Sequence, residues 1–344
     1  MSVVAPPAVC RVVRGCLAEC IHRGDMVFAD TSGRVLAFAG DPGKVAYMRS
    51  AAKPIQVLPV IETGAADRFG FTDRELAVMC GSHSGQDEHL QAVAAILSKV
   101  GINEGFLGCG THQPLSRYQS EKLIRDGKPP TPLHNNCSGK HAGMLALAVH
   151  LGFPIDGYWR ETHPVQQLMR RVVGEMTGRP EGDISVGIDG CGVSVFGVPL
   201  AAMAAAYARL VSPDYFAGAR RGAVERVVRA MVANPVMVGG AGRFCTALIS
   251  ATKGRIVGKE GADGVYCLGV RGMGIGFALK IEDGNRRAIG PVVVEALKQM
   301  GLVSEEELSA LREHGEPQVL NNRGEPVGYV ETAFDLRKET DPGR

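Results

Sequence analysis

A serine stands three residues before a lysine in segment 49–54, Arg-Ser-Ala-Ala-Lys-Pro. Because residues i and i+3 share a helix face, Lys53 could take the hydroxyl proton of Ser50 once its amine is neutral. This S-x-x-K spacing is typical of acyl-transfer enzymes with a serine nucleophile. Pro54 predicts that the helix begins no earlier than about Ser50, where free N–H groups favour negative charge. In the ordinary alternative, Ser50 is a helix cap and Lys53 is solvated.

Two further segments could complete such a site. Ser82 lies in the small polar loop 80–85, either as a turn residue or as a second hydroxyl that passes protons or binds substrate. Lys259 has three glycines close by, which let the backbone approach a ligand, and it resembles the K-T-G lysine of S-x-x-K hydrolases. A surface turn lysine is the alternative. The order of the three elements favours serine-lysine catalysis.

Two cysteines could hold a metal. Cys137 directly precedes a predicted helix, whose dipole favours the thiolate form, and such thiolates bind zinc or act as nucleophiles. With Cys191 and one nitrogen or oxygen ligand it would leave an open position on a zinc ion. His141 is chemically the simpler third ligand, because the Lys140 amine must first lose a proton. Two buried free cysteines fit the spacing equally well.

Composition limits the class of protein. The 344 residues, 45% of them hydrophobic and 22% charged, can bury a large core in one elaborate domain or two closely joined ones. A net charge of +2 without a basic stripe argues against nucleic acid as a partner. No apolar run is long enough for a membrane span, and residues 1–9 lack the pattern of a signal peptide. With nine cysteines, we expect a soluble cytoplasmic protein with reduced thiols.

Hydrophobic periodicity and turn residues predict strands at both ends of the chain and helices between them. The predicted strands are 9–13, 26–39 with a hairpin turn at 30–33, 184–198 in two pieces, 265–270 and 276–281. The predicted helices are 73–79, 86–100, 139–150, 163–177, 200–210, 215–233, 292–300 and 305–314. Segment 104–136 is expected to be loop-rich, because its three clustered prolines forbid regular helix.

These elements predict a mixed α/β (α+β) fold, in which N- and C-terminal strands form an antiparallel sheet beside a helical middle region. We expect one catalytic unit over 9–335. Its sheet part covers about 9–50 and 240–335, its helical middle covers about 51–239, and a flexible tail follows at 336–344.

Six motifs in order resemble the Rhizobium etli-type L-asparaginases. They are segments 49–54, 79–84, 136–144, 189–191, 242–245 and 257–263, and the likeness extends from about residue 10 to residue 300. The resemblance implies an amidohydrolase that converts L-asparagine and water to L-aspartate and ammonia through a serine acyl-enzyme. It also implies a fold similar to serine β-lactamases and penicillin-binding proteins, and a homodimer.

The same likeness implies a role for each site residue. Ser50 is the nucleophile with Lys53 as its partner, and Ser82 and Lys259 form a second pair. The implied zinc ligands are Cys137, Lys140 and Cys191, with water completing a site that bears on substrate affinity more than on bond cleavage. The implied substrate-binding residues are Arg49, His141 and Asp189. The residues also fit a glutaminase, a β-lactamase-like amide hydrolase, or a zinc-holding binding protein without turnover.

Overall fold

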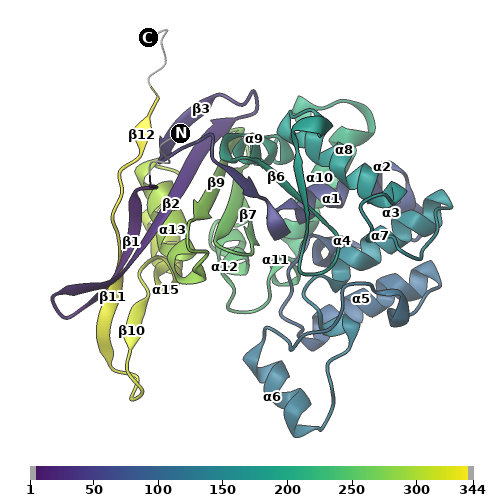
Figure 1. Cartoon of the computed structure of the whole chain (residues 1–344), viewed down its shortest axis with the longest axis horizontal. Helices are drawn as coiled ribbons and strands as arrows, with labels where there is room; N and C mark the ends of the chain where they lie inside the picture. The colour runs from purple at the N-terminus through teal and green to yellow at the C-terminus, as the bar shows by residue number, and fades with distance from the viewer. Residues whose placement is uncertain (1–4, 340–344) are drawn as a thin grey trace.

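Both ends of the chain build the main sheet of the computed structural model, which describes residues 5–339 (Figure 1). The strands are β1 Ala8–Arg14, β2 Leu17–Asp30, β3 Val35–Ala39, β7 Ile256–Gly261, β8 Val265–Val270, β9 Ile275–Ile281, β10 Gln318–Leu320, β11 Pro326–Thr332 and β12 Arg337–Lys338. Within the described residues, seven of them follow the order β10-β11-β1-β2-β9-β8-β7, while β3 pairs with β2 and β12 with β3. All these pairings are antiparallel.

A small second sheet joins segments that are far apart in the sequence. It contains β4 Val45–Tyr47, β5 Ser185–Ile188 and β6 Ser194–Pro199, in the order β4-β6-β5. Because β4 leads directly into segment 49–54 and the β5–β6 turn carries residues 189–191, this sheet brings two of the six motifs next to one another.

Helices form most of the middle of the chain, and a few more follow β9. The α-helices are α1 Lys53–Gln56, α2 Leu58–Glu62, α3 Ala65–Arg68, α4 Asp73–Cys80, α5 Asp87–Val100, α6 Arg117–Arg125, α7 Ser138–Leu151, α8 Pro164–Thr177, α9 Leu200–Leu210, α10 Gly218–Ala233, α11 Pro235–Val238, α12 Phe244–Ala251, α13 Ile289–Gln299, α14 Glu305–Ala310 and α15 Arg312–Gly315. The 3-10 helices are η1 Arg49–Ala52, η2 Glu104–Phe106, η3 Pro132–His134, η4 Glu181–Asp183, η5 Pro213–Tyr215 and η6 Arg286–Ala288.

Local sequence signals set several of the helix ends. Thr72 and Glu75 form the predicted capping box at the start of α4, each side chain bonding the other residue's backbone N–H. Helices α5 and α7 stop at Gly101 and Gly152, whose φ angles of 80° and 71° are left-handed and suit glycine.

Helix α9 fixes the main sheet against the helical middle. It packs on β2, β8 and β9 and also contacts α8. A Cβ at Gly276 would lie 1.9 Å from the Ala204 carbonyl oxygen of α9, so this close approach requires glycine. The next residue, Phe277, points to the other face of the sheet, where its ring lies 4.7 Å from that of Phe28.

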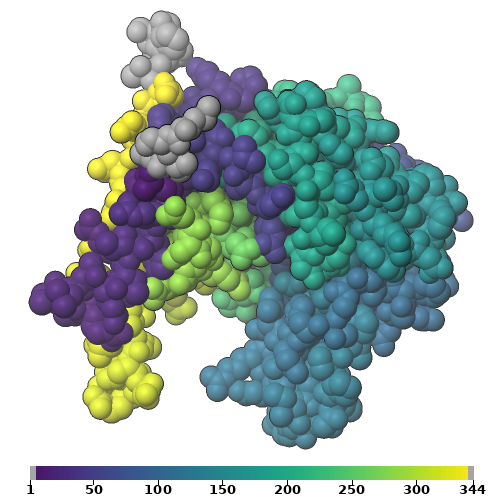
Figure 2. Space-filling view, viewed as in Figure 1, coloured from purple at the N-terminus to yellow at the C-terminus, as the bar shows by residue number. Residues whose placement is uncertain are grey.

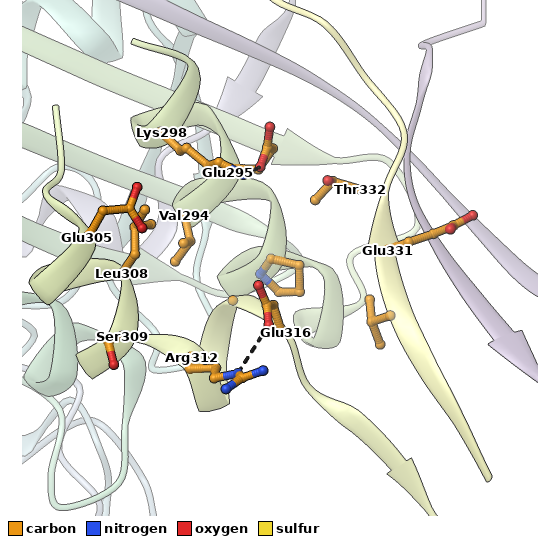
Figure 3. Close-up of a pocket in the computed structure, with 13 residues that line it drawn as sticks. Val294, Glu295, Lys298, Glu305, Leu308, Ser309, Arg312, Glu316, Glu331 and Thr332 are labelled. Atoms are coloured by element: carbon orange, nitrogen blue, oxygen red, sulfur yellow. Dashed lines mark hydrogen bonds and ion pairs between the residues drawn. The ribbon is translucent and has the colours of Figure 1, made fainter. Parts of the chain in front are cut away.

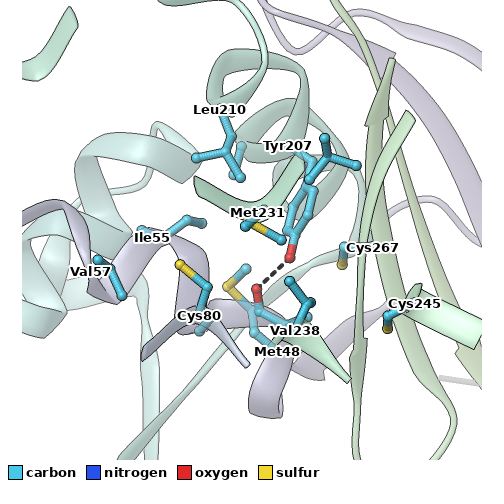
Figure 4. Packing of buried hydrophobic residues seen from close by; sticks show 14 of the residues in the cluster. Met48, Ile55, Val57, Cys80, Tyr207, Leu210, Met231, Val238, Cys245 and Cys267 are labelled. Carbon is cyan, nitrogen blue, oxygen red and sulfur yellow. Dashed lines mark hydrogen bonds between the residues drawn. The ribbon is translucent and has the colours of Figure 1, made fainter. Parts of the chain in front are cut away.

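A buried cluster supports the turn that carries Ser50 (Figure 4). The Tyr207 hydroxyl of α9 donates a hydrogen bond to the Ala51 carbonyl in η1 at 2.7 Å. Met48 and Ile55, on either side of the turn, are fully buried in the same cluster. The turn is therefore held by the core from below as well as by β4.

Two parts of the molecule project from its body. The ends of β1, β2, β10 and β11 form one projection, and the segment around α6 forms the other (Figure 1). The surface is hollowed between them (Figure 2).

The mixed α/β prediction is confirmed, with the sheet built from both ends of the chain. The expectation that segment 104–136 contains no regular helix is wrong, because α6 lies upstream of the prolines and Ser116 caps it. Arg337 and Lys338 form β12 within the segment expected to be a tail, and residues 340–344 lie outside the described residues. Within residues 5–339, no helix has the length and apolar character to cross a membrane.

Candidate active site

Ser50 lies where the small sheet gives way to helix. The Met48 N–H donates to the Phe196 carbonyl of β6 at 2.8 Å, which fixes the chain just before the turn. Helix η1 then carries Ser50 to α1, which begins at Lys53. Ser50 is half-buried, whereas Lys53 is fully buried. The serine therefore stands at the start of the helical segment, as the sequence predicts, with its lysine on the inner side.

The Lys53 amine bonds to three groups from other segments. Its acceptors are the Gly81 carbonyl at 2.8 Å, the Ser82 hydroxyl at 2.9 Å and the Asn136 carbonyl at 3.2 Å. In the described part of the chain no hydrogen bond joins this amine to Ser50, which differs from the direct pair expected. An ammonium group has three N–H donors, and these three acceptors can occupy all of them. The Lys53 amine therefore bonds to Ser82 and not to Ser50.

The Ser82 hydroxyl joins the two candidate lysines. Lys259 Nζ also lies 2.9 Å from Ser82 Oγ, and 2.5 Å from the Glu260 carbonyl oxygen. A hydroxyl has one proton, which it can donate only to an amine that is neutral, while it accepts from the other amine. This arrangement can pass a proton between Lys53 and Lys259 through one oxygen.

A close backbone approach places Ser82 between these amines. Helix α4 ends at Cys80, and the Ser82 N–H donates to the Val238 carbonyl at 2.9 Å. A Cβ at Gly81 would lie 2.3 Å from the Met237 carbonyl oxygen. Glycine is therefore required directly before the serine.

Burial determines the charge of the two lysines. It lowers the pKa of Lys259 to about 8, and the positive charge of Lys53 lowers that pKa as well. Burial also lowers the pKa of Lys53, and the nearby Lys140 contributes in the same direction. Two ammonium groups sharing one oxygen in a buried space are unfavourable, so one of them becomes neutral.

A second cluster lies at the start of α7. Cys137 is the residue before this helix, and Lys140 is in its first turn. The Lys140 amine donates to the Cys191 sulfur at 3.0 Å, and the Cys137 thiol is hydrogen-bonded to the same sulfur. All three side chains are buried. The two cysteines and Lys140 therefore converge, as the family resemblance implied.

Hydrogen bonding divides the protons of this cluster unequally. The bond from Cys137 lowers the pKa of the Cys191 thiol to about 5, and donating that bond, together with burial, raises the pKa of Cys137 to about 12. Burial acts to lower the pKa of Lys140, but the negative charge of Cys191 outweighs it and the pKa is raised. In this arrangement Cys191 is a thiolate paired with the Lys140 ammonium.

The donor set fits zinc, which prefers sulfur and nitrogen ligands. The Lys140 amine and the Cys137 thiol both contact the Cys191 sulfur, and deprotonation of Cys137 and Lys140 would free all three groups for a metal. Within residues 5–339 no group of three or more His, Cys, Asp or Glu side chains is suited to a metal ion, so this set depends on Lys140.

His141 has different partners. Its Nδ1 lies 2.6 Å from the Tyr158 hydroxyl, which accepts a hydrogen bond from the Gly108 N–H at 2.9 Å. Burial lowers the pKa of His141 to about 3, so the ring is neutral. The Tyr158 proton then goes to Nδ1, and the ring proton sits on Nε2, which is buried without a partner in the described structure. Of the two candidate third ligands, Lys140 is the one that contacts Cys191.

Arg49 connects the Ser50 turn to two acidic residues. Its guanidinium donates to Asp189 at 2.9 Å and to the exposed carboxylate of Asp263. Arg49 and Asp263 have φ angles of 50° and 55°, a left-handed conformation that is uncommon outside glycine and costs about 1–3 kcal/mol. Strain of this kind is concentrated at functional sites, and the group offers both charge signs to a small polar ligand.

A sequence model of the L-asparaginase II family matches residues 10–332. The chain belongs to the L-asparaginase II family. The match confirms the family that the six motifs predicted, a family of hydrolases that act on amides. No curated protein matches the chain.

Among solved structures, the asparaginase-family chain is similar to Mglu and to a β-lactamase. Mglu in its native form is 15% identical over 83% of this chain and 62% of its own, with a TM-score of 0.37. Mglu in its glutamate form is 16% identical over 83% and 63%, with a TM-score of 0.38. The β-lactamase, from Mycobacterium bovis, is 12% identical over 81% and 95%, with a TM-score of 0.41. The chain thus spans about 62% of the length of the first of these structures.

The structure brings the predicted site residues of this family member into two contiguous groups. The first contains Lys53, Ser82 and Lys259, with Ser50 in the turn directly before Lys53; the second contains Cys137, Lys140, Cys191, Asp189 and Arg49, and His141 follows Lys140 in α7. Sequence reasoning missed the carbonyl groups of Gly81 and Asn136 and the side chains of Tyr158, Asp263 and Glu260. Asp263 and Glu260 lie in the glycine-rich segment 257–264. Acidic side chains in such a segment were the sequence signal that could have identified them as site residues.

A cavity of about 520 Å³ lies elsewhere, between α13, α14, α15 and β11 (Figure 3). Its lining carries both charge signs, and Arg312 donates to Glu316, four residues later, at 3.3 Å. None of the candidate serines or lysines lines it. The cavity is therefore separate from the candidate active site.

Burial of Lys259 predicts a pH-dependent stability. Its pKa falls from 10.5 to about 8 on folding, so below pH 8 the protein bears the cost of a buried charge. As pH rises from 8 to 10.5 the unfolded chain holds more protons than the folded one, and stability rises. The unfolding free energy of wild type relative to Lys259→Met should increase by up to about 3 kcal/mol over this range.

Denaturant unfolding at several pH values measures this difference. Lys253→Met is the matched control, because that lysine is exposed and its unfolding difference from wild type should stay constant. A Lys259→Met difference that is flat with pH would contradict the assigned pKa.

Proposed function

We propose that the protein hydrolyses L-asparagine to L-aspartate and ammonia through an ester formed on Ser50. The observation that carries this proposal is the Ser82 oxygen, which lies 2.9 Å from both the Lys53 and the Lys259 amine, beside the turn that holds Ser50. Membership of the L-asparaginase II family supports the substrate.

Exposure supports Ser50 as the nucleophile. Ser50 is half-buried and can be reached by a substrate, whereas Ser82 is buried between the two amines. Ser50 Oγ attacks the side-chain amide carbon and its proton goes to neutral Lys53. The C–N bond then breaks, and ammonia leaves with a proton that Ser82 relays from Lys53 or Lys259. Water next cleaves the ester, which releases aspartate and restores the Ser50 hydroxyl.

The charged group beside Ser50 supports an amino acid substrate. The Arg49 guanidinium suits a bidentate contact with the α-carboxylate. Asp189 and the exposed Asp263 would then face the α-ammonium group. His141 Nε2–H, buried without a partner, is a further donor for a substrate oxygen or for a bound water.

Release of ammonia from asparagine, glutamine and their D-forms tests the substrate. We expect turnover of L-asparagine, and loss of at least about a thousandfold in kcat for Ser50→Ala with the fold intact by circular dichroism. Ser98→Ala, at an exposed position of α5, is the control and should keep full activity.

Trapping with an acylating asparagine analogue locates the ester. Mass spectrometry should find the adduct on the peptide that contains Ser50. An adduct on Ser82 would reverse the roles of the two serines. Tight binding of asparagine with neither adduct nor ammonia would instead favour a binding protein and contradict the proposed hydrolysis.

We further propose that Cys137, Lys140 and Cys191 hold zinc. When bound, the zinc would supply a positive charge that attracts polar groups of the substrate and so raises affinity. The protein's own part is to hold the two sulfurs and the amine together in a buried place next to Asp189.

Metal analysis of the purified protein tests this zinc site. Wild type should carry about one zinc per chain, and Cys191→Ser and Lys140→Met should each lose most of it, because three protein ligands are needed for tight binding. Cys20→Ser, which removes a half-buried cysteine of β2 outside the cluster, should retain zinc. Equal zinc in all variants would overturn the site.

We also propose that the protein is cytoplasmic and forms a homodimer through the outer face of the strand projection. All nine cysteines are free, which suits a reducing compartment. Ile21 and Tyr329 are about half exposed, and pairing with Arg11 and Val13 of β1 puts them on the same face of the sheet. Two large apolar side chains on one open sheet face favour a partner.

Light scattering on wild type should give the mass of two chains. Ile21→Glu combined with Tyr329→Glu should give the mass of one, since the change places charge in the contact. Tyr118→Glu, at an exposed site on α6, should leave the dimer intact. A wild-type mass of one chain would rule the dimer out.

A further inference from the structure

Neighbouring residues of β7 face opposite sides of the main sheet. Lys259 pairs with Cys267 of β8, and Glu260 pairs with Tyr266. Because side chains alternate along a strand, the Lys259 amine points to Ser82 while the Glu260 carboxylate points to the other face. The two charges lie close in sequence, but the backbone of β7 stands between them.

The Glu260 side chain is held by two arginines. Its carboxylate accepts from Arg243 at 3.0 Å and from two nitrogens of Arg286, one of them at 2.9 Å. Burial acts to raise the pKa of this carboxyl group, but the arginines outweigh it and the pKa is lowered. Glu260 is therefore a buried carboxylate whose single negative charge faces two positive ones.

The main chain of Glu260 holds the Lys259 amine. Its carbonyl accepts from Lys259 Nζ at 2.5 Å, and its N–H donates to the Cys245 sulfur at 3.1 Å. Arg243 and Cys245 belong to motif 242–245, and Glu260 belongs to motif 257–263. The contacts thus join motif 242–245, which the proposed reaction leaves without a role, to the motif that carries Lys259.

We propose that Arg243 and Arg286 are positioning residues that act on Lys259 through Glu260. The inference rests on the proposed function, because it assigns a task to the lysine that shares Ser82. The arginines fix the carbonyl that orients the amine, and they offset the carboxylate charge that would otherwise favour the ammonium form.

Other charged and titratable groups also act on Lys259. They are Lys53 of α1, Cys80 of α4, Ser82 after α4, Arg243 and Cys245 at the start of α12, Cys267 of β8 and Glu260 itself. Among these, Glu260 alone is a carboxylate, and Arg243 bonds to it directly. Changing the partners of Glu260 therefore alters the charge near Lys259 without altering the groups around Ser82.

The arginine side of this arrangement is open to mutation. Arg243, Glu260, Arg286, Arg287 and His314 line a cavity of about 390 Å³, and neither Ser50 nor Ser82 lines it. Arg286 is half exposed, so its replacement leaves the core packed. Arg287 lines the same cavity but donates to His22 instead of Glu260. It provides a matched control at the next position in the sequence.

The expected pH shifts have opposite signs. Turnover that depends on the charge of Lys259 changes as pH passes through the pKa of that lysine, whichever of its two forms is the active one. Arg286→Gln leaves the carboxylate less compensated, which favours the ammonium form and moves the midpoint of kcat against pH upward by about one unit. Glu260→Gln removes the negative charge and leaves both arginines, which moves the midpoint downward by about one unit.

Arg286→Lys should return the midpoint close to wild type, because it keeps the positive charge, and Arg287→Gln should not shift it. Lower kcat in Arg286→Gln and Glu260→Gln with an unchanged midpoint would show a structural role only and overturn the inference. If Glu260→Gln fails to fold, the upward shift in Arg286→Gln and its recovery in Arg286→Lys still decide the question.

A titration that needs no turnover separates this inference from the proposed function. The ¹³C shift of the Lys259 Cε carbon, assigned by its loss in Lys259→Met, should titrate with the same opposite shifts in the two variants. Opposite shifts without ammonia release by wild type would refute the proposed function and leave this inference standing. Ammonia release by wild type, with no shift of the Lys259 titration in either variant, would refute this inference and leave the proposed function standing.

Discussion

One oxygen shared by two buried amines is the constraint on which the site depends. Ser82 Oγ lies 2.9 Å from both Lys53 and Lys259, in a place that burial keeps from water. Two ammonium groups there would repel one another and leave the hydroxyl proton without an acceptor. The favourable state has one charged and one neutral amine, with the serine donating to the neutral one. The fold thereby maintains a base without a histidine.

The architecture supplies that oxygen and those amines from three separate parts of the chain. Lys53 follows the small sheet, Ser82 follows α4 and Lys259 lies in β7 of the main sheet. Tyr207 of α9 ties the Ser50 turn to the core, and the glycine at 81 allows the serine loop to approach α11. Because α9 also packs on β2, β8 and β9, it joins the Ser50 turn to the main sheet that carries Lys259.

Sequence reasoning could find the fold class and the chemical groups, because they depend on local patterns. Strand alternation, capping residues and the S-x-x-K spacing predicted the sheet, the ends of α4, α5 and α7, and the residues near Ser82. It missed α6, since prolines downstream of a helix do not forbid the helix itself. It also predicted a direct bond between Lys53 and Ser50, which the described part of the structure does not have. The carbonyl groups of Gly81 and Asn136 help to hold the Lys53 amine near Ser82, and residue types do not show where a backbone carbonyl lies in the fold.

Tertiary contacts distinguish Lys140 from His141, which residue chemistry alone leaves open as partners of the two cysteines. Imidazole is the commoner metal ligand, and His141 is the neighbour of Lys140 in the same helix turn. Yet the His141 ring is bonded by Tyr158 through Nδ1, while the Lys140 amine meets the Cys191 sulfur at 3.0 Å. The Lys140 amine is charged and pairs with the Cys191 thiolate, so neither group is an isolated buried charge.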